Sequence, residues 1–556
     1  MPETTTVAEA VGATLARLGV GHAFGVVGSG NFHVTNALRA HGVPFTAARH
    51  EGGAATMADA YARMSGRVAV LTTHQGCGLT NALTGIAEAA KSRTPMLVLA
   101  ADTAASSVLS NFRIDQDAAV RAVDATAERT HSGETAVADT VRAYRTAVEQ
   151  RRTVVLNLPL DVQTQPVPVA AELPDPPSRP NSCRPDADSV AALADALAGA
   201  RHPVFIAGRG ARGAREELRA LAERCGALLA TSAVAHGLFH DDPWSLGISG
   251  GFATPLAAEL IGSADLVVAW GCALNMWTTR HGKLLSPSAR LVQIDDDPSA
   301  LGAHRPVDLG VVGDCALTAA DADRALRERG HDLSAGGFRE RRTAEALRER
   351  GRWNEIEHQD ISTADRIDPR TLSQELDQLL PAERLVSIDS GNFMGYPSAY
   401  LSVPDEYGFC FTQAFQSIGL GLATGIGAAL ARPDRLPVAA LGDGGFLMSV
   451  SELETAARLG LPLLVVVYDD AAYGAEVHHF GPGTEPPPDL GAVRFPDRDL
   501  AAIGRGFGCE GVTVRQVSDL KAVSAWLEGP RRTPLVVDAK IAEDGGSWWL
   551  AEAFGH

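Results

Sequence analysis

The sequence predicts an α/β protein with three doubly wound domains, each built on a mainly parallel sheet. The first observation is the length, because 556 residues are enough for about three domains that each bury a core. The second is that apolar segments of strand length alternate with helical patterns along the whole chain. The third is that two stretches of different composition, one rich in proline and one dense in charge, interrupt this alternation.

The apolar segments that we predict as strands cover residues 22–27, 68–72, 96–100, 153–157, 203–207, 265–270, 290–294, 385–389, 437–441, 463–468 and 534–538. The proline-rich stretch, residues 166–187, is predicted to be a linker. The charge-dense stretch, residues 331–365, is predicted to be an exposed helical connector. We therefore expect an N-terminal domain over residues 1–165, a central domain over 188–330 and a C-terminal domain over 366–556.

Composition restricts the partners and the compartment. The formal net charge is −18 and no basic cluster is present, which argues against nucleic acid and against an anionic membrane surface as partners. No uninterrupted apolar run reaches the length of a membrane span, and residues 1–4 lack the pattern of a signal peptide. The seven cysteines are scattered without the spacing of metal ligands. We expect a cytoplasmic protein with reduced thiols.

The segment from Leu441 to Gly474 carries the clearest chemical signal. It places a Gly-Asp-Gly-Gly turn after one apolar strand and a pair of aspartates after the next, with a helical pattern between them. In such a βαβ unit the strands are parallel, so Asp443 and Asp470 are predicted at the edge where open α/β sheets bind ligands. Two carboxylates beside glycine N–H groups suit a magnesium ion that holds a diphosphate. The alternative is an ordinary turn at Asp443 and a strand cap at Asp470.

This segment resembles the metal–diphosphate motif of thiamin diphosphate (ThDP) enzymes. Asp470 follows Asp443 by 27 residues, which is the spacing of that family. Relatives usually carry asparagine at the second position, and Asp470 keeps the hard oxygen ligand that magnesium needs. The resemblance implies that Asp443, Asp470 and the backbone carbonyl of Ala472 bind Mg²⁺. It also implies cofactor contacts from the loop residues Gly442, Gly444, Gly445, Tyr473 and Gly474.

A second stretch, from Arg49 to Ala55, is similar to the HEGGAA signature of the same family. The resemblance makes Glu51 the carboxyl group that hydrogen-bonds nitrogen N1′ of the cofactor's pyrimidine and favours its imino form. An apolar pocket would raise the pKa of such a glutamate, so that it can hold the proton. The alternative is an acid at a helix N-terminus, stabilised there by the helix dipole.

Two N-terminal loops contain residues that the resemblance places near the reacting carbon. Ser29 lies in a glycine-rich loop, residues 24–31, which is similar to the family's FGxPG loop. His74 aligns with an active-site histidine of benzoylformate decarboxylase and could transfer a proton, and Gln75 is expected to bind a substrate carbonyl. The alternatives are a turn residue at Ser29 and a structural histidine at His74.

The C-terminal part adds three further matches to the family. Glu476 lies six residues past Asp470, like a proton-relay glutamate of pyruvate decarboxylase, although it could equally be an exposed helix acid. Gly391 and Asn392 lie in a loop similar to the one that receives the diphosphate. The turn Gln416-Ser417-Ile418-Gly419 resembles the GSIG or GTMG turn, whose aliphatic residue wedges under ThDP and bends it. Core packing is the alternative for Ile418.

The resemblance implies a ThDP- and Mg²⁺-dependent enzyme that makes or breaks a C–C bond next to the carbonyl of a 2-oxo acid. The helix and loop patterns favour acetolactate-synthase-like decarboxylation followed by carboligation to a second carbonyl compound. Ser29 with His74 favours the alternative, a benzoylformate-type decarboxylase that releases an aldehyde. The family assembles its active sites between subunits, so we expect a homodimer or homotetramer. We do not expect FAD, because the central domain shows no legible flavin site.

Two other classes of protein are considered. A nucleotide-binding oxidoreductase is suggested by the GxGxxG pattern from Gly208 to Gly213, which follows a predicted strand. The ribose-binding acid expected about 20 residues further on is unconvincing. A non-catalytic protein with the ThDP fold is the third class. The presence of Glu51, Asp443 and Asp470 argues against it, because a protein without catalytic activity does not need all three.

Overall fold

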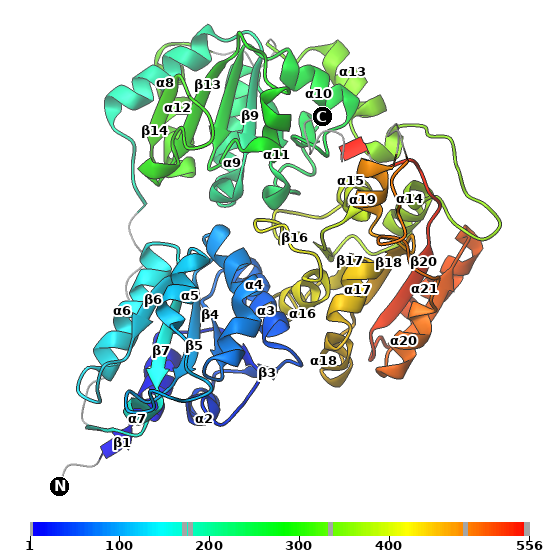
Figure 1. The fold of residues 1–556 in the computed structure, drawn as a ribbon. Helices are drawn as coiled ribbons and strands as arrows, with labels where there is room; N and C mark the ends of the chain where they lie inside the picture. The colour runs from blue at the N-terminus through cyan, green and yellow to red at the C-terminus, as the bar shows by residue number, and fades with distance from the viewer. Residues whose placement is uncertain are drawn as a thin grey trace.

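The structure is a computed structural model that describes residues 4–168, 175, 182–331, 337–481, 487–546 and 548–549. The described chain forms three six-stranded sheets, and every strand pair within them is parallel. A separate antiparallel pair joins β1 (Thr4–Thr6) to β8 (Pro166–Pro168). Figure 1 shows three bodies, one per sheet, each with helices around it. The predicted α/β fold with three parallel domains is confirmed.

The first and last sheets have the same strand order. The N-terminal sheet runs β3-β2-β4-β5-β7-β6 and the C-terminal sheet runs β16-β15-β17-β18-β20-β19. The N-terminal strands are β2 (His22–Gly25), β3 (Phe45–Ala47), β4 (Ala69–Thr73), β5 (Met96–Asp102), β6 (Thr126–Arg129) and β7 (Thr153–Pro159). The C-terminal strands are β15 (Arg384–Ile388), β16 (Phe409–Phe411), β17 (Leu436–Gly442), β18 (Leu464–Asp469), β19 (Glu510–Val514) and β20 (Leu535–Lys540).

The central sheet has a different order, β11-β10-β9-β12-β13-β14. Its strands are β9 (Pro203–Ala207), β10 (Leu228–Thr231), β11 (Ser245–Ile248), β12 (Leu266–Trp270), β13 (Arg290–Asp295) and β14 (Leu309–Val312). The order reverses between β9 and β12, which makes their carboxyl ends the switch point of this sheet. Much of the predicted linker, residues 169–174 and 176–181, lies outside the described residues.

The N-terminal and C-terminal domains of one chain are joined through two helices. Helix α3 (Glu51–Ser65) packs along α16 (Gly421–Ala431), and both contribute buried side chains to one apolar core, among them Met57 and Ile426. In the predicted connector, helix α13 (Arg341–Arg350) buries Leu347 and leaves its arginines at the surface. No helix in the described part of the chain is long and apolar enough to cross a membrane.

Candidate active site

The two predicted metal-binding aspartates lie at neighbouring strand ends. Strands β17 and β18 pair in parallel, Asp443 follows β17 directly, and Asp470 follows β18. Both side chains line a cavity of about 1190 Å³ that is enclosed by residues of all three domains. Burial, with repulsion from Asp470 and Asp469, raises the pKa of Asp443 to about 8. Burial, with repulsion from Asp469, raises the pKa of Asp470 to about 7. A bound divalent cation would offset this buried negative charge.

The neighbouring Asp469 has a structural partner of its own. The Lys540 ammonium group, at the end of β20, lies 2.5 Å from Asp469 and 2.6 Å from Asp497. Asp470 is therefore the aspartate of the pair that faces the cavity. The backbone then reverses at Ala471, whose φ of 55° is in the left-handed region, and the amide of Ala472 donates to Asp470 over 3.2 Å. Among the described residues no three acidic, histidine or cysteine side chains form a metal cluster.

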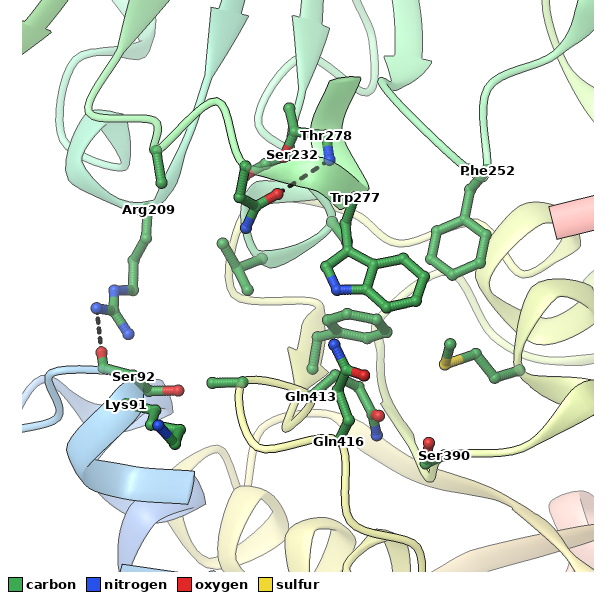
Figure 2. A pocket seen from close by; sticks show the side chains of 18 of the residues that line it. Lys91, Ser92, Arg209, Ser232, Phe252, Trp277, Thr278, Ser390, Gln413 and Gln416 are labelled. Atoms are coloured by element: carbon green, nitrogen blue, oxygen red, sulfur yellow. Dashed lines mark hydrogen bonds between the residues drawn. The ribbon is translucent and has the colours of Figure 1, made fainter. Parts of the chain in front are cut away.

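Most of the predicted cofactor-binding residues line this cavity, and Figure 2 shows the part of it where the three domains meet. Those that line it are Gly391, Asn392, Gln416, Ile418, Gly442, Gly444, Gly445, Ala472, Tyr473 and Gly474, together with the predicted proton-relay residue Glu476. Glu476 is exposed in the first turn of α19 (Gly474–Phe480). Ser417 is not among the lining residues, and its hydroxyl donates to the carbonyl of Ile418.

Sequence analysis missed Asp389, which holds the turn at residues 416–419 in place. Asp389 follows β15, is fully buried and accepts hydrogen bonds from the amides of Gly419 and Leu420 at 3.0 and 3.3 Å. Burial raises its pKa to about 6. A Cβ atom at Gly445 would lie 2.1 Å from the same carboxylate, so only glycine fits there. An aspartate at the end of a predicted strand was the available signal.

The turn that Asp389 holds presents Ile418 to the cavity. Ile418 keeps 36% of its surface exposed, which excludes simple core packing as its role in the single chain. Gln416, two residues earlier, has a φ of 61°, a conformation that costs a non-glycine residue on the order of 1–3 kcal/mol. An exposed aliphatic side chain beside buried carboxylates fits a cofactor with an apolar ring and a charged tail.

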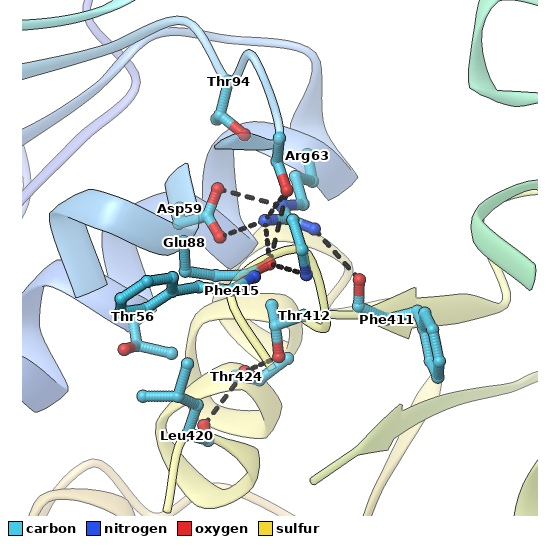
Figure 3. A network of polar contacts seen from close by, with 12 residues as sticks. Thr56, Asp59, Arg63, Glu88, Thr94, Phe411, Thr412, Phe415, Leu420 and Thr424 are labelled. Atoms are coloured by element: carbon cyan, nitrogen blue, oxygen red, sulfur yellow. Dashed lines mark hydrogen bonds and ion pairs between the residues drawn. The ribbon is translucent and has the colours of Figure 1, made fainter. Parts of the chain in front are cut away.

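A buried charge network fixes the strand-to-turn segment before Gln416 (Figure 3). On α3, Arg63 pairs with Asp59 at 2.6 Å and with Glu88 of α4 (Cys77–Lys91) at 2.8 Å. Arg63 also donates to the carbonyl of Phe411. Glu88 accepts from the amides of Ala414 and Phe415 at 3.1 and 2.7 Å. All three charged side chains are at most 6% exposed, so the N-terminal domain fixes a loop of the C-terminal domain from within the protein.

The remaining predicted residues gather at the edge of the N-terminal sheet. Ser29 and His74 follow the adjacent strands β2 and β4, and the Ser29 hydroxyl lies 3.3 Å from Nε2 of His74. His74 Nδ1 lies 3.1 Å from the carbonyl of Gln75, which is buried. Glu51 begins α3 and accepts a hydrogen bond from Asn81 over 3.1 Å. The structure thus brings Ser29 and His74 together, as their pairing in sequence analysis anticipated.

In one chain these four residues do not join the cavity that contains the aspartates. Glu51, Ser29, His74 and Gln75 are absent from its lining among the described residues. The start of α3 is instead held by Glu452 of α18 (Glu452–Arg458), which accepts from the amides of Arg49 and His50. One chain therefore holds the predicted site residues in two separate places, the predicted diphosphate half-site around Asp443 and the predicted pyrimidine half-site around Glu51.

The glycines of the central domain have a packing role. A Cβ atom at Gly208 would lie 2.2 Å from the carbonyl oxygen of Gly271, because the loops after β9 and β12 cross closely. The GxGxxG pattern also leads into a short 3₁₀ turn, and helix α9 (Arg215–Cys225) begins only at Arg215. Close crossing of the two loops therefore accounts for Gly208 and Gly210 without a nucleotide, whereas a Cβ atom at Gly213 would meet nothing within 4 Å.

The fold and the diphosphate half-site define a ThDP-dependent enzyme. The N-terminal, central and C-terminal domain models of the thiamine pyrophosphate enzymes match residues 5–125, 190–321 and 389–539. The chain belongs to this family, and each matched region overlaps one sheet of the structure.

Curated relatives cover nearly the whole chain. Sulfoacetaldehyde acetyltransferase of Castellaniella defragrans is 30% identical over 96% of this chain and 93% of its own length. The probable 2-ketoarginine decarboxylase AruI of Pseudomonas aeruginosa is 32% identical over 93% of this chain and 90% of its own length. The acetolactate synthase large subunit of Parasynechococcus marenigrum is 28% identical over 97% of this chain and 88% of its own length. The relatives are acyl transferases, decarboxylases and carboligases by name.

Proposed function

We propose that this enzyme uses ThDP and Mg²⁺ to decarboxylate a 2-oxo acid and to transfer the remaining acyl unit to a second carbonyl compound. The observation that carries the proposal is the Asp443–Asp470 pair, which lies at one end of a cavity of about 1190 Å³. The cavity continues past Ile418 to the central domain, which leaves space for two substrates beyond the diphosphate half-site. Relatives named as an acetyltransferase and an acetolactate synthase support the transfer step.

The residues of the two half-sites would bind different parts of the cofactor. Asp443, Asp470 and the carbonyl of Ala472 would hold Mg²⁺, and the backbone around Gly391 and Gly444 would receive the diphosphate. Ile418 would support the bent cofactor from below. When bound, the cofactor supplies a carbanion and an electron sink for loss of CO₂.

In the pyrimidine half-site, Glu51 would hold a proton at the pyrimidine nitrogen N1′ of the cofactor. Glu476 would face the substrate from the diphosphate side, since it lines the same cavity as the aspartates. Gln75 would hydrogen-bond a substrate carbonyl from the pyrimidine side. These roles need both half-sites around one cofactor.

The active form that we propose is a homodimer, or a homotetramer built from such dimers, in which Glu51 of one chain serves the cofactor held by Asp443 of another. Support comes from the separation of the half-sites in one chain and from large apolar side chains exposed around both. On the pyrimidine side these are Val27, Phe32, Phe112 and Ile114, and on the diphosphate side Phe415, Ile418, Leu447 and Met448. Exposed apolar surface of this kind is typical of a subunit interface.

A second candidate function is a decarboxylase that releases an aldehyde. The contact of 3.3 Å between Ser29 and His74 favours it, because a histidine held by a hydroxyl at this edge could protonate the product before an acceptor arrives. The two functions differ only in what takes up the acyl unit.

The test is a panel of 2-oxo acids offered with ThDP and Mg²⁺, with and without an aldehyde or 2-oxo acid acceptor, with products identified by mass spectrometry. We expect CO₂ release and a coupled hydroxyketone product that requires the acceptor. Free aldehyde as the main product in the presence of acceptor would favour the second candidate. No consumption of any 2-oxo acid by cofactor-loaded protein would reject both.

A further inference from the structure

Glu452 is a buried carboxylate that the proposed chemistry does not use. It is the first residue of α18 in the C-terminal domain, and only 1% of it is exposed. Its Oε1 atom accepts from the backbone amides of Arg49 and His50, 403 and 402 residues earlier in the chain, at 3.1 and 3.0 Å. Its Oε2 atom accepts from the hydroxyl of Thr455 over 2.7 Å. Both carboxylate oxygens are thus engaged, and Oε1 holds the two residues directly before the predicted catalytic Glu51.

The segment that Glu452 holds determines where Glu51 lies. Strand β3 ends at Ala47 and α3 begins at Glu51, so residues 48–50 alone connect the two elements. Figure 1 shows α18 beside this connection. His50 is the N-cap of α3, with extended backbone and a side chain that accepts a hydrogen bond from the first turn of the helix. Because Glu51 is the first helical residue, a shift of the N-cap would move its backbone directly.

The first turn of α3 leaves room for the Glu452 carboxylate. A Cβ atom at Gly53 would lie 2.5 Å from Oε1 of Glu452 and 3.0 Å from its Cγ. Because the Glu452 side chain is enclosed, it could not move away from such an atom without losing its amide donors. Glycine at position 53 therefore permits the contact. A negative charge at this end of a helix is also favoured by the helix dipole.

We propose that Glu452 is a positioning residue for Glu51: it fixes the backbone of residues 49 and 50 so that the Glu51 carboxyl group meets nitrogen N1′ of the cofactor. This inference rests on the proposed function, in which Glu51 holds a proton at that nitrogen. Such a hydrogen bond requires the carboxyl group to be placed to within about 0.5 Å. Asn81 orients the Glu51 carboxylate over 3.1 Å, whereas Glu452 fixes the backbone from which that side chain extends.

The first measurement needs no cofactor. Hydrogen–deuterium exchange of the cofactor-free protein, resolved to the peptide of residues 47–53, reports whether the backbone there is held. We expect Glu452→Ala to speed the exchange of this peptide's most protected amides at least about 10-fold. Glu452→Gln should stay within about 3-fold of wild type, because its oxygen can accept both amides and its NH₂ group can donate to the Thr455 hydroxyl. Glu454→Ala is the matched control, since Glu454 contacts only the side chain of Arg49, and it should stay within about 2-fold.

The second measurement follows the cofactor's C2 proton. With ThDP and Mg²⁺ bound, C2 proton exchange and kcat should fall at least about 10-fold in Glu452→Ala, while ThDP affinity stays within about 3-fold of wild type. Glu452→Gln should retain C2 proton exchange to within about 3-fold. Gly53→Ala tests the same contact from the opposite side. It should lower C2 proton exchange at least about 3-fold alone, but less than about 2-fold when added to Glu452→Ala, where the carboxylate is already gone.

The outcomes separate this inference from the proposed function. Equal effects of Glu452→Ala and Glu454→Ala, or parallel losses of C2 proton exchange and ThDP affinity in Glu452→Ala, would show a general structural role and overturn the inference. If Glu452→Ala does not fold, unchanged C2 proton exchange in Gly53→Ala would overturn it. Decarboxylation of a 2-oxo acid by the wild type would in either case leave the proposed function standing. A wild-type protein that binds ThDP without exchanging its C2 proton would reject the proposed function itself.

Discussion

The first and last sheets have the same strand order, but their carboxyl edges present different chemistry. At the N-terminal edge Ser29 has a partner in His74 and Glu51 has one in Asn81, whereas the buried amide oxygen of Gln75 has none among the described residues. At the C-terminal edge Asp443 and Asp470 are buried like charges with raised pKa values. The C-terminal edge therefore carries an excess of buried negative charge, which the proposed Mg²⁺ would offset. In the proposed function the same fold serves both halves of one cofactor site, because the residues at the strand ends carry the function.

Removing the Asp443 carboxylate, a predicted Mg²⁺ ligand, should have the largest effect on cofactor binding and activity. We expect Asp443→Ala to lose cofactor binding in the presence of Mg²⁺ and to lower kcat/KM by about 1000-fold, because one metal ligand is gone. ThDP titration followed by tryptophan fluorescence measures this loss. Asp489→Asn, an exposed aspartate in a surface loop, is the control and should behave like wild type. Normal Mg²⁺-dependent ThDP binding by Asp443→Ala would remove the metal assignment.

A substitution in the pyrimidine half-site should change kcat and leave ThDP affinity nearly unchanged. We expect Glu51→Gln to bind ThDP with near-normal affinity but to lose about 100-fold or more in kcat, because an amide cannot hold the proton at N1′. Exchange of the cofactor's C2 proton with deuterium, followed by NMR, reports this step directly. Retained C2 proton exchange in Glu51→Gln would contradict the proposed role of Glu51. Loss of ThDP binding in this variant would contradict the proposed difference between the two half-sites.

The contact between the two domains of one chain should matter mainly for stability. Glu88→Ala leaves Arg63 with one carboxylate and leaves two partly buried amides without their partner, and we expect a loss of about 3 kcal/mol in the free energy of unfolding. Chemical denaturation measures it, with Glu149→Ala as the control, since the Arg145–Glu149 pair lies on the surface and contributes about 0.3–0.5 kcal/mol. Equal losses of unfolding free energy in the two variants would show that the Arg63–Glu88 network does not stabilise the segment of residues 411–415.

A further prediction concerns the pH dependence of stability without metal. Because the pKa of Asp443 is raised from 3.8 to about 8, the folded protein without metal binds this proton more tightly than the unfolded chain does. The free energy of unfolding should therefore fall as the pH rises from about 4 to about 8, and Mg²⁺ with ThDP should remove that decline. Melting temperatures in EDTA and in Mg²⁺ with ThDP test this. A metal-free protein that becomes more stable over this range would contradict the pKa shift.

Which strands could be predicted from the sequence depended on how deeply each strand is buried and on how long it is. All eleven predicted strands overlap observed strands, since apolar runs such as β5 and β18 are buried on both faces. Sequence analysis missed the two edge strands of every sheet. These strands are only three to five residues long: β3, β6, β11, β14, β16 and β19. A short strand with one neighbour does not show a clear apolar run.

The candidate site divides in the same way. The aspartates were predictable because their positions follow from local order along a single βαβ unit. Asp389, Glu88 and Glu452 were not, because each acquires its meaning from a partner far away in sequence, as Glu88 does from Ala414 at a separation of 326 residues. The shared strand order of the first and last sheets could not be seen in the sequence, since the two domains show no repeat.

Mixing two inactive variants tests most directly whether the two edges meet across a subunit boundary. Glu51→Gln and Asp443→Ala homodimers, unfolded together in equal amounts and refolded, should form hybrids in which one of the two sites has both residues intact. The mixture should regain about a quarter of wild-type activity. If activity stays at the level of the separate variants while hybrids are shown to form, Glu51 and Asp443 of one chain serve the same cofactor and the account is wrong.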